Sequence, residues 1–153
     1  MLGATVQVSA PCDGEVLALK DVKDPTFADQ LVGPGVGIEP PDGRQLVVAP
    51  ADGMLLKLDP HAFILLVDGA VGVLVHVGIN TVQLKGEGFE VLAEQGSTVT
   101  AGTPIVEWDP AAITADGMER TVLVVLMDQA PDTTSSDVIG GYVRAGEPLF
   151  RTI

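Results

Sequence analysis

Short apolar runs rich in valine, isoleucine and leucine recur along the whole chain, separated by turns that contain glycine, proline and aspartate. Runs of this length, bounded by turn residues, are typical of β-strands rather than of helices. Their close spacing favours an antiparallel β-sandwich or barrel over an alternation of strands and helices. The strands predicted in this way are residues 4–9, 15–19, 36–39, 45–49, 54–58, 63–67, 71–77, 104–107, 121–127 and 148–152.

Two echoed motifs indicate that this β structure is internally duplicated. The Ala-Pro-x-Asp-Gly segment at residues 10–14 returns at 49–53, and the unit Val-x-Ala-Gly-x-Pro followed by Ile or Leu at residues 99–105 returns at 143–149. In the first motif, the Asp-Gly pair supplies residues that turns favour. The repeats therefore predict pseudo-duplicated hairpins within an all-β fold.

Only two stretches indicate helix, and both are short. In residues 109–113, an aspartate that can cap a helix precedes a proline at the first helical position. Residues 25–30 are long enough for a single turn. Helix is therefore expected to be a minor part of the fold.

Length and composition indicate one domain over residues 1–153, because this length supports a single hydrophobic core of ordinary size. The apolar runs are far shorter than the roughly 18 residues that a membrane span needs, so we expect no insertion into a bilayer. The N-terminus lacks the pattern of a secretory signal, and the single cysteine, Cys12, cannot form an internal disulfide. We therefore expect a cytoplasmic protein in which Cys12 is structural or incidental.

The net charge is −13, from 21 acidic and 8 basic residues. This charge opposes binding to nucleic acid and to anionic lipid. It serves solubility, and it would also accelerate the approach of a basic protein partner.

Histidine chemistry is restricted to His61 and His76, the two histidines of the chain. His76 interrupts the apolar run 71–79, where a polar ring is unexpected. Taken alone, such a residue is more often a buried histidine with a satisfied hydrogen bond than a catalytic group.

The surroundings of both histidines resemble the glucose-type IIA family of the bacterial sugar phosphotransferase system. Residues 74–90, Leu-Val-His-Val-Gly-Ile-Asn-Thr-Val-Gln-Leu-Lys-Gly-Glu-Gly-Phe-Glu, are similar to the active-site region of that family. Fifteen residues upstream of His76, the Pro-His-Ala-Phe segment at 60–63 is similar to its second histidine motif. The likeness continues over most of the chain, including residues 10–14, 22–37, 49–53 and 96–105.

The resemblance implies a compact antiparallel β-sandwich with both histidines in a shallow apolar depression, and a phosphotransferase activity that requires no cofactor. His76 would be the nucleophile that takes a phosphoryl group from the histidine-containing phosphocarrier protein, HPr, and passes it to a cysteine of the cognate IIB domain. His61 would hydrogen-bond the phosphoryl oxygens. A free-standing carrier is expected, although a domain excised from a larger permease would have the same sequence pattern.

The resemblance also implies supporting and partner-binding residues. The carbonyl of Gly78 would orient the imidazole of His76. Asn80 occupies a position where the family commonly has an aspartate that pairs with an arginine of HPr, so this attraction should be weaker. The positions that match partner-binding residues are Asp24, Phe27, Val32, Leu74 and Val82, and an exposed apolar rim is expected there. Directly before His61, this chain has Asp59-Pro60, which differ from the residues that commonly precede the second histidine in the family. We expect the Asp59 carboxylate to point away from a phosphoryl group.

Three alternatives remain open at this stage. A zinc hydrolase would need three protein ligands, whereas His61 and His76 supply two; a weak zinc site completed by a partner's carboxylate stays compatible with the family. A biotinyl- or lipoyl-type carrier would need an exposed lysine at a tight turn, which Met54-Leu55-Leu56-Lys57 does not provide. A regulator would report sugar flux by binding other transporters or kinases according to its phosphorylation state.

Overall fold

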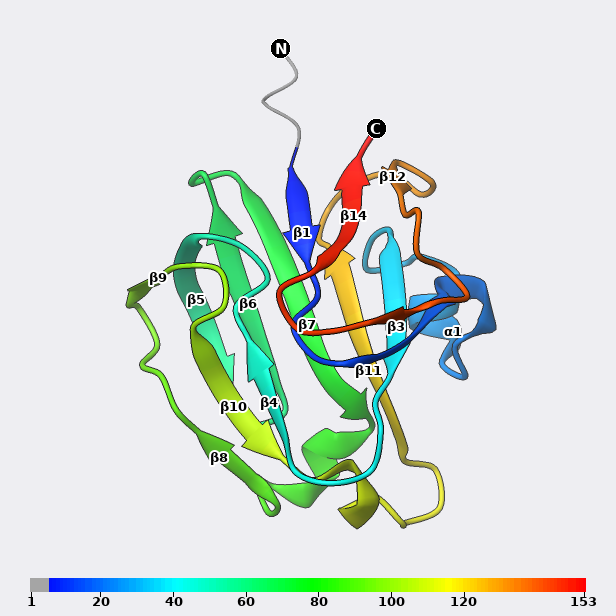
Figure 1. Ribbon diagram of the computed structural model, residues 1–153, viewed down its shortest axis with the longest axis vertical. Coiled ribbons are helices and arrows are strands. Elements are labelled where there is room, and N and C mark those ends of the chain that lie inside the picture. Colours follow the sequence, from blue (N-terminus) through cyan, green and yellow to red (C-terminus); the bar gives the residue numbers. More distant parts are fainter. Residues whose placement is uncertain (1–5) are drawn as a thin grey trace.

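Three antiparallel sheets form the computed structural model, which describes residues 6–153 (Figure 1). The strands of the large sheet, in the order in which they pair, are β13 (Tyr142–Val143), β2 (Gly14–Ala18), β3 (Gly35–Glu39), β11 (Glu119–Leu126), β7 (Val71–Ile79), β6 (Ala62–Val67), β5 (Gly53–Asp59) and β9 (Thr98–Val99). The two small sheets are β1 (Gln7–Ser9), β14 (Pro148–Thr152) and β12 (Thr134–Ser135), and β4 (Gln45–Val48), β10 (Pro104–Trp108) and β8 (Phe89–Val91).

The main core lies between the large sheet and the two small ones. β1 and β14 cross in front of β7 and β11, and their side chains Val8 and Phe150 join the same buried cluster as Val75 and Val77 of β7 (Figure 1). The strict alternation of side chains along a strand turns the intervening residues, Leu74 and His76 among them, to the outer face. The predicted sandwich of antiparallel strands is confirmed.

A smaller apolar cluster covers part of that outer face. The chain between β2 and β3 forms a 3₁₀ turn, η1 (Leu19–Asp21), and the helix α1 (Pro25–Ala28), which pack on Leu123 and Val125 of β11. In Figure 1, α1 lies beside β3 at the edge of the molecule. Two further 3₁₀ turns are η2 (Thr81–Leu84) and η3 (Pro110–Ala112). In the part of the chain that the structure describes, no helix combines the length and hydropathy that a membrane span requires.

The predicted duplication appears as matching hydrogen bonds in the two halves. Gly102 N–H donates to Ala49 O and Gly146 N–H donates to Ala10 O, both at 2.9 Å. The large sheet has the same symmetry, since its strand order places β7 and β11 at the centre with four strands on each side of their boundary. The two Ala-Pro-x-Asp-Gly turns therefore occupy equivalent places in the two halves.

The aspartate of each repeated turn ties that turn to a repeated hairpin. Asp52 Oδ1 accepts a hydrogen bond from Ala101 N–H, and Asp13 Oδ1 accepts one from Ala145 N–H, both at 2.8 Å. These bonds join segments that are far apart in the chain. A charged acceptor makes each bond stronger than a neutral one would be.

We expect Asp52→Ala and Asp13→Ala each to lower the free energy of unfolding by about 1 kcal/mol, because each leaves one backbone N–H without its carboxylate acceptor. Urea titration followed by the fluorescence of Trp108 measures this, since this sole tryptophan is 1% exposed. Asp116→Ala, at an exposed carboxylate, is the matched control and should change stability by less than about 0.5 kcal/mol. Equal losses in all three variants would contradict a clamping role.

Most predicted strands coincide with observed ones, with small differences at the ends. Residues 4 and 5 lie outside the described part of the chain, and β1 begins at Gln7. Leu19 begins η1 instead of ending a strand, and Met127 follows the end of β11. The strands β8, β9, β12 and β13 lie outside the predicted ranges because two or three residues are too few to establish a period.

The helical predictions were partly wrong. The segment 109–113 contains η3, with the Asp109 side chain accepting from Ala111 N–H at 2.9 Å as a cap. The helix predicted at 25–30 ends at Ala28, since Gln30 adopts a left-handed conformation with φ of 56°. The turns η1 and η2 contradict the prediction that only two stretches are helical, because single 3₁₀ turns carry no helical periodicity.

Candidate active site

His76 lies at the centre of the large sheet, on its outer face. In the strand register it stands between Ala62 of β6 and Leu123 of β11. Its neighbours Val75 and Val77 point into the main core and are fully buried. The imidazole itself is half-buried on the outer face of the sheet.

His61 lies in the two-residue turn Pro60–His61 that joins β5 to β6. Its carbonyl accepts a hydrogen bond from Val77 N–H at 2.7 Å, which attaches this turn to the residue after His76. The two imidazole centroids are 5.3 Å apart, and their planes are inclined by 71°. The structure thus brings together the two histidines that the sequence analysis selected.

One ring nitrogen of His76 is engaged by the backbone. Its Nδ1 lies 2.5 Å from the carbonyl oxygen of Gly78. A carbonyl oxygen only accepts hydrogen bonds, so Nδ1 must carry the proton. In the neutral ring the lone pair is then on Nε2, which is the nitrogen available as a nucleophile.

Several groups act on the pKa of His76, and together they lower it below the ordinary value of 6.5. Burial is the largest cause, because it disfavours the charged imidazolium. The Gly78 carbonyl and the negative charge of Asp24 raise the pKa, whereas His61 lowers it. Since the net effect is a decrease, the ring is neutral at pH 7.

A hollow opens where β7 ends at Ile79, three residues after His76. Its lining residues are Lys23, Asp24, Pro25, Ile79, Asn80, Gly117 and Glu119. Asp24 also caps α1, since its Oδ1 accepts from Thr26 N–H at 2.9 Å. Asn80 has a left-handed backbone with φ of 62°, and its Nδ2 donates to Gly117 O at 2.6 Å. The side-chain amide of Asn80 is therefore hydrogen-bonded to the backbone of the segment that contains Gly117.

The apolar residues expected around the site differ in exposure. Val82 is 55% exposed, whereas Val32 and Leu74 are half-buried at the edge of the smaller cluster. Phe27 is only 8% exposed, and its ring centroid lies 5.6 Å from that of His76. Phe27 is therefore not part of the exposed apolar rim that was expected, because α1 packs its ring against the large sheet.

Known proteins resemble this chain in sequence and in structure. The family model described as phosphoenolpyruvate-dependent sugar phosphotransferase system, EIIA 1, matches residues 6–131. The chain belongs to this family. It is 35% identical over 137 residues to the glucose-specific EIIA component of Staphylococcus epidermidis, an alignment that covers 87% of this chain and 81% of that protein.

Other relatives of this IIA chain are longer. It is 39% identical over 126 residues to the glucose-specific EIIBCA component of Corynebacterium glutamicum, covering 81% of this chain and 18% of that protein. The chain therefore spans less than a fifth of that relative. The glucose permease IIA of Mycoplasma capricolum superposes with a TM-score of 0.84 at 27% identity, covering 99% of this chain and 97% of that one. This IIA chain is thus a phosphocarrier component of a sugar phosphotransferase system, with the fold of that permease domain.

Two features of the site in this IIA chain have no signal in the sequence. Lys23 Nζ lies 3.4 Å from Glu119 Oε1, across the hollow and nearly one hundred positions away along the chain. Thr81 is completely buried beside Gly78. In the sequence, Thr81 between Asn80 and Val82 resembles an ordinary polar turn residue. Only its burial in the structure distinguishes it from one.

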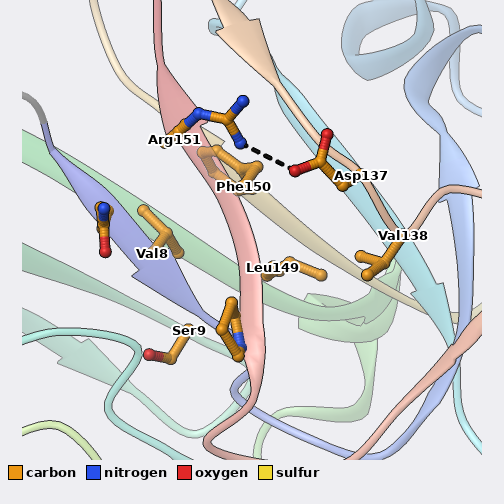
Figure 2. A pocket seen from close by; sticks show the side chains of 9 residues that line it. Val8, Ser9, Asp137, Val138, Leu149, Phe150 and Arg151 are labelled. Atoms are coloured by element: carbon orange, nitrogen blue, oxygen red, sulfur yellow. Dashed lines mark hydrogen bonds and ion pairs between the residues drawn. The ribbon is translucent and has the colours of Figure 1, made fainter.

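A second hollow lies away from the histidines, on the small sheet that contains β1 and β14. Figure 2 shows Val8, Leu149 and Phe150 lining it, with the ion pair between Arg151 and Asp137 at one side; the two charged groups are 3.1 Å apart. This sheet covers the inner face of the large sheet, whereas the histidines lie on the outer face. The second hollow therefore contributes nothing to the histidine site.

We expect the imidazole of His76 to remain neutral below pH 6.5, because burial lowers its pKa. Between 6.5 and this lowered value the unfolded chain binds a proton that the folded chain does not. Stability should therefore fall as the pH decreases through that window. A titration of the ring signals by NMR measures the pKa, with the same titration in guanidinium as the control, where the midpoint should return to about 6.5. A folded midpoint at or above 6.5 would contradict this account.

Proposed function

We propose that His76 is the phosphorylated residue of this IIA chain, receiving a phosphoryl group from the phosphohistidine of HPr and passing it to a cysteine of a IIB domain. The observation that carries this proposal is the hydrogen bond from His76 Nδ1 to the Gly78 carbonyl. It leaves the Nε2 lone pair as the nucleophile, in a ring whose lowered pKa keeps it neutral.

The relay consists of two displacements at phosphorus. In the first, His76 Nε2 attacks, the Nε2–P bond forms, and the N–P bond to the donor histidine breaks. In the second, a thiolate of the IIB domain attacks, an S–P bond forms, and the Nε2–P bond breaks. His76 leaves the cycle neutral, with the proton still on Nδ1 and hydrogen-bonded to the Gly78 carbonyl.

His61 acts as the hydrogen-bond donor to the phosphoryl oxygens, a role that its ring supports from a centroid distance of 5.3 Å. Phosphoryl transfer requires mainly positioning and compensation of charge on the equatorial oxygens. The apolar neighbours Ala62 and Leu123 limit access of water, which slows hydrolysis of the phosphohistidine.

Partners dock on the surface around His76. Asp24 and the hollow beside it suit a cationic side chain of HPr, while Val32, Leu74 and Val82 supply apolar contact. Asn80 adds an amide where a carboxylate would attract an arginine more strongly. The net charge of −13 favours a basic donor.

The IIB partner belongs to a membrane sugar permease, and the Corynebacterium glutamicum relative, an EIIBCA component, combines B, C and A components in one protein. The reaction takes place on the cytoplasmic side, where phosphoenolpyruvate is available. The IIA chain itself does not recognise the sugar in this scheme.

The histidine pair does not fit a complete metal site. Among residues 6–153, no three His, Cys, Asp or Glu side chains come together as a metal-binding group. Catalytic zinc normally has three protein ligands, so zinc at His61 and His76 would require a carboxylate from a partner. No step of the relay is assigned to a metal.

The experiment is incubation of the chain with phosphoenolpyruvate, the first enzyme of the system and HPr, followed by intact mass analysis at alkaline pH and peptide mapping. We expect one acid-labile phosphoryl group on His76. A phosphoryl group on His61, or no transfer at all, would reject the proposed relay.

A further inference from the structure

We propose that Thr81 is a positioning residue for both imidazoles of the site, which it controls through the peptide groups on either side of Val77. This inference rests on the proposed function of His76 and His61. Thr81 and Thr121 are the two polar residues counted as buried among residues 6–153. Thr81, at 0% exposure, lies directly under the turn that follows His76.

The hydroxyl of Thr81 holds one carbonyl of that turn. Thr81 Oγ1 lies 2.6 Å from Val77 O, and since a carbonyl only accepts, the hydroxyl is the donor. This bond spans four residues and closes the chain from Val77 to the start of η2. It fixes the plane of the peptide between Val77 and Gly78.

Val77 is held on its other side by His61. Its N–H donates to His61 O at 2.7 Å, so the two peptide groups of this residue carry bonds to His61 and to Thr81. A rotation of the backbone at Val77 would therefore move the turn that bears His61. Thr81 restrains that rotation.

The methyl group of Thr81 restrains Gly78. Gly78 has a φ of 83°, and a Cβ built there would come within 2.5 Å of Thr81 Cγ2 and 2.8 Å of Glu119 O. Thr81 thus packs against the Gly78 backbone, whose carbonyl oxygen accepts the hydrogen bond from His76 Nδ1–H, with the nitrogen 2.5 Å from the oxygen. One side chain fixes the peptide before Gly78 with its hydroxyl and packs against Gly78 with its methyl.

The consequence is control over which nitrogen of His76 reacts. A rotation of the Val77–Gly78 peptide changes φ of Gly78 and so moves the Gly78 carbonyl away from Nδ1. The neutral ring can then place its proton on Nε2. An Nε2–H ring has no lone pair directed at the donor phosphorus. Thr81 therefore acts on phosphoryl transfer without touching the phosphoryl group.

The test compares Thr81→Val with Thr81→Ser. Valine keeps the branched shape and loses the hydroxyl, whereas serine keeps the hydroxyl. The readouts are the ¹⁵N chemical shifts of the His76 ring at a pH where it is neutral, and the rate of phosphoryl acceptance from phospho-HPr. For Thr81→Val we expect a larger share of the Nε2–H tautomer and a rate at least about tenfold lower, since misplacing a reacting group by about 1 Å costs on the order of 100-fold. Thr81→Ser should restore both values toward those of the unmodified chain.

Thr121→Val is the matched control. The Thr121 hydroxyl donates to Glu39 Oε1 at 2.9 Å, so this variant also loses a hydrogen-bonded hydroxyl from a residue that is 7% exposed. It should leave the His76 tautomer and the transfer rate unchanged. Should Thr81→Val not fold, Thr81→Ala removes the hydroxyl without adding bulk, and the same tautomer shift is expected.

Retention of the Nδ1–H tautomer and of the rate in both hydroxyl-free variants would overturn the proposal. A change in rate that serine does not rescue, with the tautomer unaltered, would also overturn it. The ¹⁵N readout needs no phosphoryl donor. If the unmodified chain accepted no phosphoryl group, the proposed function would be rejected, whereas a tautomer shift in Thr81→Val would still support the positioning role.

Discussion

A His76→Gln variant should accept no phosphoryl group from phospho-HPr. Glutamine fills much of the volume of the imidazole on the outer face of β7, but its amide nitrogen has no lone pair that can attack phosphorus. We do not expect His61 to replace the missing nucleophile. It lies in the Pro60–His61 turn, and the Gly78 carbonyl is hydrogen-bonded to the ring of His76 and not to that of His61. The loss should be complete within the sensitivity of intact mass analysis.

The fold of this variant should be intact, because His76 is only half-buried and its removal opens no cavity in the main core. Urea denaturation followed by Trp108 fluorescence tests this, and we expect a change of less than about 1 kcal/mol. A phosphoryl group bound by the folded His76→Gln variant would reject the assignment of the nucleophile.

A His61→Gln variant should accept the phosphoryl group and fail to pass it on. In the first step the incoming bond is made by His76 Nε2, which keeps its contact with Gly78 in this variant. In the second step negative charge must be stabilised on the phosphoryl oxygens as the Nε2–P bond breaks, and His61 is the proposed donor. Loss of one such positioned donor costs on the order of 100-fold or more in rate.

The measurement is a pulse in which the phosphorylated variant is isolated from HPr and then mixed with the IIB domain. The unmodified chain serves as the control for IIB activity, and His76→Gln serves as the control for acceptance. Onward transfer at the unmodified rate, or failure to accept the phosphoryl group at all, would contradict the separate roles of the two histidines.

Local sequence patterns account for most of the strands and for the direction in which the His76 side chain points. The alternation in Val71–Ile79 turns Val73, Val75 and Val77 inward and therefore turns His76 outward, whatever the strand pairs with. The repeated Ala-Pro-x-Asp-Gly turns likewise predict a duplicated fold, because identical turn chemistry produces the same local geometry. These conclusions need only the covalent order of the residues.

The duplication does not predict that only one half carries a site. Val77 N–H donates to His61 O, and in the other half Leu126 N–H donates to Pro34 O at 2.9 Å, so Pro34 stands where His61 stands. On that half the outer face is covered by α1 and Phe27, which pack on Leu123 and Val125. The two-residue turn Pro60–His61 between β5 and β6 leaves the outer face around His76 uncovered. The longer connection between β2 and β3, which contains α1, covers the outer face of the other half.

Composition and periodicity were sufficient for the all-β class and the repeated hairpins, because these depend on residues close together in the chain. The choice of His61 and His76 came from the resemblance of their surroundings to the IIA family. The tautomer of His76, the burial of Thr81 and the Lys23–Glu119 pair depended on the folded structure. Such features arise where strands from distant parts of the chain meet, and the direction of a carbonyl or the loss of water around a hydroxyl has no counterpart in the order of the residues.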